Sequence, residues 1–199
     1  MNLYMIRHGQ SLANSLHMHA GWSDSPLTEC GEAEARSVRP LLENIKFSKI
    51  YVSDLVRASR TAELALGSRD FILTPSVREI NMKKIAGIPY AELEKMYGEK
   101  YLECRRRWDF SPFGCESVPE FEDRVNSFLD RIVEENYRDD TNICVVTHAG
   151  VIRIAAKRIV PIEISDRYSL SISNASVTVF GISEDKRWRI RHWNYTPEL

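Results

Sequence analysis

The sequence has only four cysteines, and no two of them form a Cys-x-x-Cys pair. This spacing excludes the common zinc-ribbon patterns, and free thiols in a reducing cytoplasm are the simplest interpretation. No stretch approaches the roughly 20 consecutive apolar residues that a membrane-spanning helix needs. The opening segment MNLYMIRHG also lacks the basic start and long apolar core of a signal peptide. We therefore expect a cytoplasmic protein without a membrane partner.

An excess of either charge is also missing. Lys and Arg together number 27, Asp and Glu 28, and the formal net charge is -1. This balance gives no general attraction to nucleic acid, so nucleic acid is not an expected partner and any basic patch must be local. The 199 residues, of which 43% are hydrophobic and 28% charged, suit a single globular domain over residues 1–199.

Short β-branched runs alternate with longer helical stretches, which is the pattern of an α/β fold. Strands are predicted at 2–7, 48–53, 70–77 and 142–147, followed by a hairpin of strands at 175–182 and 187–195. Helices are predicted at 28–45, 54–66 and 119–137, and from residue 151 onwards, with a kink or a new turn at Pro40 in the first of them. We expect a three-layer α/β/α sandwich with a mixed, mainly parallel sheet, whose central strands are those at 2–7, 48–53 and 142–147.

Residues 78–117 interrupt this alternation, because Gly and Pro recur among short helical pieces. A segment of this length inside a compact domain usually forms a lid or a pocket wall. We predict that it is a cap-like insertion over the carboxyl edge of the sheet. Just before it, the helix at 54–66 is expected to begin with a side-chain cap from Ser53 or Asp54.

Chemistry-bearing residues follow the ends of three predicted strands. The first strand ends at Arg7 and His8, the second leads into a helix with Arg57 in its first turn, and the buried strand ends before His148. In a mainly parallel sheet these ends lie at one edge, where ligands bind. Two arginines, two imidazoles and the helix N-termini that begin there would suit an anion, and a phosphoryl group in particular.

With these residues in view, the sequence resembles the histidine phosphatase superfamily, also called the phosphoglycerate-mutase-like family. The motifs stand in the family's order and spread over most of the chain. The resemblance implies the phosphoglycerate mutase-like fold, no metal, no cofactor, and a small phosphorylated metabolite as partner. It is carried by RHGQS (7–11), Asn14, GWSDSPLTECG (21–31), SDLVRASRTA (53–62), RE (78–79), GCES (114–117) and VVTHAG (145–150).

The resemblance also implies roles for single residues. His8 would carry a covalent phosphoryl group, and Glu79 would be the proton donor, with Asp54 and Glu116 as alternative acids. Neutral imidazole is a competent nucleophile near neutral pH, and arginines with a protonated His148 can stabilise the charge on the transferred group. The residues expected to hold or border the phosphoryl group are Arg7, Asn14, Gly21, Arg57, His148 and Ala149.

Several departures from the family pattern concern the substrate. Gln10 stands where the family often has Glu, and the stretch 81–87 lacks the Gly-x-Trp-Glu-Gly pattern that is common in the phosphatases. In CRRRWDF (104–110), Arg105 and Arg106 resemble the paired arginines with which phosphoglycerate mutases bind an acidic substrate. We predict that these two arginines bind substrate; a solvated helix end is the alternative.

The favoured function is a metal-independent phosphomonoesterase that acts through a phosphohistidine. Its substrate class stays open and includes α-ribazole 5′-phosphate. The alternatives are phosphoryl transfer of the phosphoglycerate mutase type and a non-catalytic module that binds a phosphorylated ligand. A homodimer is left open. His17 and His19 are expected to have a structural or solvent-facing role, because no third metal ligand accompanies them.

Overall fold

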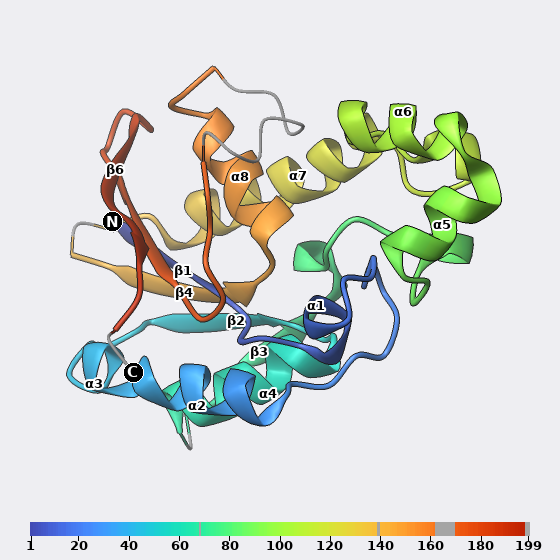
Figure 1. The fold of residues 1–199 in the computed structure, drawn as a ribbon. Helices are drawn as coiled ribbons and strands as arrows, with labels where there is room; N and C mark the ends of the chain where they lie inside the picture. The colour runs from blue at the N-terminus through green and yellow to red at the C-terminus, as the bar shows by residue number, and fades with distance from the viewer. Residues whose placement is uncertain (68, 139, 162–169, 198–199) are drawn as a thin grey trace.

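The computed structural model describes residues 1–67, 69–138, 140–161 and 170–197. A mixed sheet in the order β3-β2-β4-β1-β5-β6 forms its centre (Figure 1). β1, β2, β3 and β4 are mutually parallel, whereas β5 and β6 are antiparallel additions, as the sequence predicts. The strands are β1 (Asn2–Arg7), β2 (Lys49–Ser53), β3 (Ile72–Thr74), β4 (Asn142–Thr147), β5 (Val177–Ile182) and β6 (Trp188–Tyr195).

The strand predicted at 70–77 is shorter in the structure. β3 ends at Thr74, and the 3₁₀ turn η1 (Pro75–Val77) follows directly. Pro75 has no backbone N–H to give to a sheet, and the Thr74 hydroxyl accepts a hydrogen bond from Ser76 N at 3.2 Å. The turn aims the chain after Val77 toward the centre of the carboxyl edge.

The register of the two central strands brings distant histidines together. Arg7 of β1 stands opposite Thr147 of β4, and His8 N donates to Thr147 O at 2.9 Å. Because the strands are parallel and in register, the next residues, His8 and His148, leave the sheet side by side. The ends of β1 and β4 therefore lie at the same edge of the sheet, as the sequence pattern predicts.

Helices cover both faces of the sheet, so the fold is the predicted α/β/α sandwich (Figure 1). Successive residues of β1 divide between the two layers, with Met5 in one core and Ile6 in the other. Full burial of such side chains contributes about 1.5–3 kcal/mol each. One face packs against α7 (Val118–Asn136) and α8 (Ala149–Lys157), and the other against α2 (Glu29–Ser37), α3 (Arg39–Leu42) and α4 (Val56–Leu66).

One local prediction is confirmed and another needs correction. The helix expected at 28–45 is divided at Val38, where α2 ends and α3 begins with Pro40 in its first turn, as the proline predicts. α4 has Leu55 as its N-cap residue and no side-chain cap, so neither Ser53 nor Asp54 has the predicted role. Both of these side chains have partners from other parts of the chain.

The 78–117 segment consists of short helices beside the carboxyl edge of the sheet (Figure 1). Leu93, Tyr101 and Phe110 are fully buried and join the core formed by α7. The segment is thus packed on the domain and is not a linker. No helix in the described ranges is long and apolar enough to cross a membrane. The elements of the segment are η2 (Lys83–Ile85), α5 (Tyr90–Tyr97), α6 (Glu99–Arg107) and η3 (Ser111–Phe113).

Candidate active site

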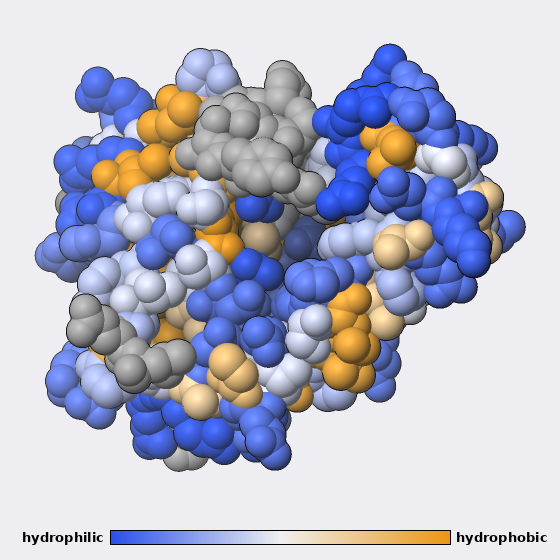
Figure 2. Space-filling view, in the orientation of Figure 1, coloured by the Kyte–Doolittle hydropathy of each residue, from blue (hydrophilic) through white to orange (hydrophobic). Residues whose placement is uncertain are grey.

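A cavity of about 190 Å³ lies at the carboxyl ends of β1 and β4, where the sequence predicts the site. Figure 2 shows a hollow in this face of the molecule, beside the α5 and α6 region. Most of the predicted site residues border the cavity. These are Arg7, His8, Asn14, Gly21, Arg57, Glu79 and Ala149, while His148 is fully buried beside His8.

The orientation of His8 suits a nucleophile. Its side chain is only 4% exposed, and Nδ1 lies 2.7 Å from the carbonyl oxygen of Gly9. A carbonyl can only accept, so Nδ1 carries the proton and Nε2 keeps its lone pair. Gly9 is itself fixed, because its N–H donates to the Thr61 hydroxyl of α4 at 3.0 Å. The strand end therefore sets both the position and the tautomer of the imidazole.

The electrostatics of the site keep His8 neutral. Burial lowers the pKa of His8 well below its ordinary value of 6.5, and the positive charges of Arg57 and Arg7 lower it further. The hydrogen bond to the Gly9 carbonyl acts in the opposite direction but is the smallest of these influences. An unprotonated imidazole is the form that can attack phosphorus.

His148 lies against His8 and is held by β2. The two ring centroids are 5.0 Å apart in an edge-on arrangement, and His148 Nε2 lies 2.8 Å from the Ser53 hydroxyl. Burial, then Arg57, His8 and Arg7, lower the pKa of His148 well below 6.5. The protonated His148 expected from the sequence is therefore wrong for this structure, because the expectation ignored desolvation and the neighbouring cations.

Two buried guanidinium groups supply the positive charge. Arg57 is fully buried, and its Nη2 donates to the Gly21 carbonyl at 2.6 Å; Arg7 Nη1 donates to the Ile172 carbonyl at 2.6 Å. Burial lowers the pKa of each arginine to about 10, although Glu79 partly opposes the shift. Both groups thus remain protonated at neutral pH.

Several buried nitrogens around His8 have no partner within the described protein. Among the described residues, Arg7 Nε, Arg57 Nε and His148 Nδ1 are buried and have no hydrogen-bond partner. A buried polar group without a partner typically costs about 1–3 kcal/mol, and more if it is charged. A tetrahedral oxyanion at His8 would offer acceptors to such a set, which is the expected design for a phosphoryl group.

Glu79 is held by backbone donors at the other side of the cavity. Its Oε1 accepts from Ile80 N at 3.0 Å, and its Oε2 accepts from Gly150 N at 3.2 Å. A Cβ on residue 150 would clash with Glu79 Oε1 and crowd the Phe121 ring, so a larger residue would displace the carboxylate from this position. This close approach explains why a glycine follows Ala149 at the start of α8.

The two alternative acids have other partners. Asp54 accepts from Arg78 Nε at 2.6 Å, and Glu116 accepts from Arg124 Nε at 2.9 Å. Neither carboxylate borders the cavity around His8. Of the three candidates, the structure brings only Glu79 to the predicted site.

Sequence reasoning missed the residues that hold the Glu79 backbone. Trp22 Nε1 donates to the Glu79 carbonyl at 2.6 Å, and Arg124 Nη2 donates to the same oxygen at 3.3 Å. The Trp22 ring lies between Arg78 and Arg124, with guanidinium carbons 4.6 and 5.7 Å from its centre. Trp22 lies within the motif at 21–31, whereas Arg124 gave no local signal because its contacts with the backbone of residues 75–79 are distant in sequence.

Asn14 and Asn174 form a second support for His8. Asn14 Oδ1 accepts from Ser11 N at 3.1 Å and from Asn174 Nδ2 at 3.2 Å. The same Asn174 nitrogen donates to the His8 carbonyl at 3.2 Å. With its oxygen so engaged, the amide of Asn14 has its nitrogen available at the cavity. Asn174, far along the chain, was not recognised from the sequence.

The arginine run of α6 stays outside this cavity. Arg106 forms an exposed ion pair with Glu99, and Arg105 lies over the outer part of Tyr90, 5.3 Å from its ring centre. Neither belongs to the residues that border the site. His19, by contrast, is buried beside the site with its Nε2 2.9 Å from the Tyr101 hydroxyl.

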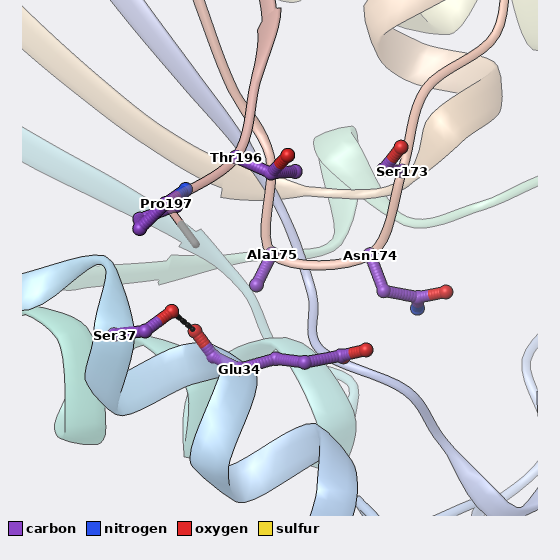
Figure 3. A pocket seen from close by; sticks show the side chains of 7 residues that line it. All are labelled: Glu34, Ser37, Ser173, Asn174, Ala175, Thr196 and Pro197. Carbon is purple, nitrogen blue, oxygen red and sulfur yellow. Dashed lines mark hydrogen bonds between the residues drawn. The ribbon is translucent and has the colours of Figure 1, made fainter. Parts of the chain in front are cut away.

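A larger cavity, of about 430 Å³, lies between α2 and the loop before β5 (Figure 3). Asn174 borders it, and Ser37 donates to the Glu34 carbonyl at its edge. Its described lining has no cation and no nucleophile beyond hydroxyl groups. Size therefore does not identify the site, whereas the convergence of charges around His8 does.

Acidification is expected to destabilise the protein through the two buried histidines. Both are neutral when folded and gain a proton on unfolding below pH 6.5, the ordinary value. The unfolded state then binds more protons, so the free energy of unfolding falls by up to about 1.4 kcal/mol per pH unit for each histidine. Denaturant unfolding between neutral pH and about pH 5.5 measures the slope, which His148→Gln should reduce. His192→Gln, a matched change at an exposed histidine, should leave the slope unchanged. An unchanged slope in His148→Gln would show that the buried histidine does not cause the loss of stability.

Comparison with known proteins agrees with this geometry. A family model described as the histidine phosphatase superfamily (branch 1) matches residues 3–196. "Phosphoglycerate mutase-like protein 4" of Arabidopsis thaliana is 32% identical over 99% of this chain and 86% of its own length. The "Adenosylcobalamin/alpha-ribazole phosphatase" of Salmonella typhimurium is 26% identical over 92% of each chain. The crystal structure of the alpha-ribazole phosphatase from Shigella flexneri superimposes with a TM-score of 0.86 at 26% identity, covering 98% of this chain and 96% of that one.

Proposed function

The chain belongs to the histidine phosphatase superfamily (branch 1), and from this premise we propose that it hydrolyses a small phosphomonoester through a phosphohistidine at His8. The observation that carries the proposal is the set of groups around His8. A neutral imidazole with a fixed tautomer is surrounded by two buried arginines, and a carboxylate stands across the cavity. A site that only bound phosphate would need neither the nucleophile nor the carboxylate.

In the first step, His8 Nε2 attacks phosphorus in line with the ester oxygen. The N–P bond forms as the P–O bond to the leaving group breaks. Arg7 and Arg57 stabilise the equatorial oxygens, where negative charge collects in the transition state. Glu79, in its protonated form, gives its proton to the departing alkoxide, which leaves as an alcohol.

In the second step, water replaces the alcohol. Glu79 is now ionised and takes a proton from the water as its oxygen attacks phosphorus. The N–P bond breaks, the electron pair returns to His8 Nε2, and inorganic phosphate forms. The carboxylate ends the cycle protonated, so acid and base are the same residue in alternate steps. Trp22 and Arg124 support both steps by fixing the Glu79 backbone.

Hydrolysis is favoured over mutase-type transfer by the location of the arginine run. A phosphoglycerate mutase must hold an acidic substrate while the phosphoryl group returns to it. Arg106 is bound to Glu99, and Arg105 to the Tyr90 ring, so these cations are engaged away from His8. We therefore propose a phosphatase. Release of phosphate from a panel of small phosphomonoesters, measured against transfer to phosphoglycerate, tests the choice directly.

Activity is expected to survive chelation. Arg7 and Arg57 remain protonated at neutral pH and supply the positive charge that a divalent cation supplies in other phosphatases. Phosphate release in EDTA should match release without it, and vanadate should inhibit competitively because it mimics the transferred group. Activity that EDTA abolishes and Mg²⁺ restores would overturn the proposal.

A further inference from the structure

The cavity has two chemically different ends. Its inner end holds the cations around His8, whereas its outer wall is apolar and aromatic. Arg153 also borders the cavity, and its Nε donates to the Leu170 carbonyl at 3.2 Å. The outer wall comes from the loop after α1 and the 78–117 segment. Its side chains are Met18, His19, Ile80, Met82, Tyr90 and Trp108.

Trp108 occupies its place in this wall against the preference of its backbone. It ends α6 with φ 55° and ψ 31°, in the left-handed region where glycine or asparagine is usual. A bulky aromatic residue is uncommon in that conformation, and strained positions of this kind are enriched at active sites and ligand-binding regions. The ring reaches the cavity and packs against Phe110, with centroids 5.5 Å apart.

The aromatic side chains of the wall also pack against one another. The Tyr90 ring lies 4.6 Å from the His19 ring on one side, with Arg105 over it at 5.3 Å. Trp108 lies 6.0 Å from the same histidine. Met18 and Met82 complete the wall with side chains that adapt to irregular apolar shapes. Packed rings beside flexible thioethers suit a flat apolar group.

From this wall we propose that the leaving group of the natural substrate carries a flat apolar or aromatic ring, and that Trp108 is the main specificity-determining residue for it. The inference rests on the proposed phosphatase function. With the phosphoryl group at His8, a ring attached through a short linker would lie along Trp108 and Met82. An acidic substrate such as a phosphoglycerate would instead face apolar surface at the same place.

Three primary alkyl phosphates test the proposal, because the bond broken is the same in each. They are 2-phenylethyl phosphate, ethyl phosphate and 3-phosphoglycerate. We expect kcat/KM for the phenylethyl ester to exceed that for either other substrate by about ten-fold, the size of a good aromatic contact. Trp108→Asn suits the left-handed backbone but lacks the ring, and it should bring the phenylethyl-to-ethyl ratio close to one. Tyr97→Ala, which removes an exposed ring of α5 outside the wall, should leave that ratio unchanged.

The outcomes separate the two levels of inference. If none of the three esters is hydrolysed, the proposed function fails. If ethyl phosphate or 3-phosphoglycerate is hydrolysed without a preference for the ring, the function stands and the substrate class is wrong. A ratio that survives in folded Trp108→Asn removes Trp108 from its role. Should that variant not fold, inhibition of the unaltered protein by 3-phenylpropylphosphonate against propylphosphonate measures the same preference.

Discussion

Replacing His8 by alanine is expected to abolish phosphoenzyme formation from every phosphomonoester and to lower kcat by at least about 10⁴-fold, the scale on which loss of a covalent nucleophile acts. The geometry gives no substitute. His148 is bound to Ser53 through Nε2, lies deeper than His8 and does not border the cavity. Rapid quench with a ³²P-labelled ester should therefore give a labelled protein when His8 is present and no labelled protein in the His8→Ala variant.

The matched control is His192→Ala, which removes an exposed imidazole from β6 and should leave labelling intact. Binding of vanadate separates lost chemistry from lost structure, because Arg7 and Arg57 remain in the variant. His8→Ala should still bind the anion, although more weakly without the nucleophile. Label on a folded His8→Ala protein, at His148 or elsewhere, would show that the phosphoryl acceptor has been misassigned.

The sheet and its reactive edge could be predicted because they depend on patterns that are short in sequence. The apolar run of β4 indicates a strand buried on both faces, and alternation in β1 divides its residues between two cores. Once the strands are parallel, the residues that follow them must share an edge. That step alone brings His8, Arg57 and His148 together without knowledge of any side-chain contact.

What could not be predicted depends on partners that are far away in the chain. Ser53 and Asp54 have good capping side chains, yet one binds His148 and the other binds Arg78. The local capping rule therefore failed, because both side chains bind partners that are distant in the sequence. The prediction that His148 is protonated failed for a related reason. Its pKa is set by burial and by the cations around it, neither of which a linear pattern reveals.

The predicted substrate contacts of the arginine run also could not be judged from the sequence alone. The order of residues in CRRRWDF indicates a basic helix end but gives no direction for the side chains. α6 turns Arg106 toward Glu99, whereas the next aromatic residue, Trp108, borders the cavity. Arg105 and Arg106, which the sequence predicts to bind substrate, thus lie about one helical turn before Trp108, which lines the site. The positioning residues Asn174 and Arg124 were unpredictable because each acts through backbone carbonyls.

The second large effect is expected at Glu79, and it should depend on the leaving group. Glu79→Gln cannot donate a proton to a poor alkoxide, so phosphorylation of His8 by an alkyl phosphate should slow by ~10²–10⁴-fold. Nitrophenolate leaves without protonation, so phosphorylation of His8 by p-nitrophenyl phosphate should slow much less. The second step still needs a base to activate water. Labelled phosphohistidine should therefore accumulate in the variant when the aryl ester is used.

The contacts of Glu79 decide how this result is to be interpreted. Ile80 N and Gly150 N each donate to one carboxylate oxygen, and a glutamine has only one oxygen to receive them. Glu79→Gln therefore also loses a positioning contact, but that loss acts equally on alkyl and aryl esters. The ratio between the two esters isolates the proton transfer. Glu116→Gln is the matched control: its pairing with Arg124 holds the same backbone, so it should slow both esters alike. If Glu79→Gln slows both esters equally at the first step while Glu116→Gln alters the ratio, the proton donor is Glu116.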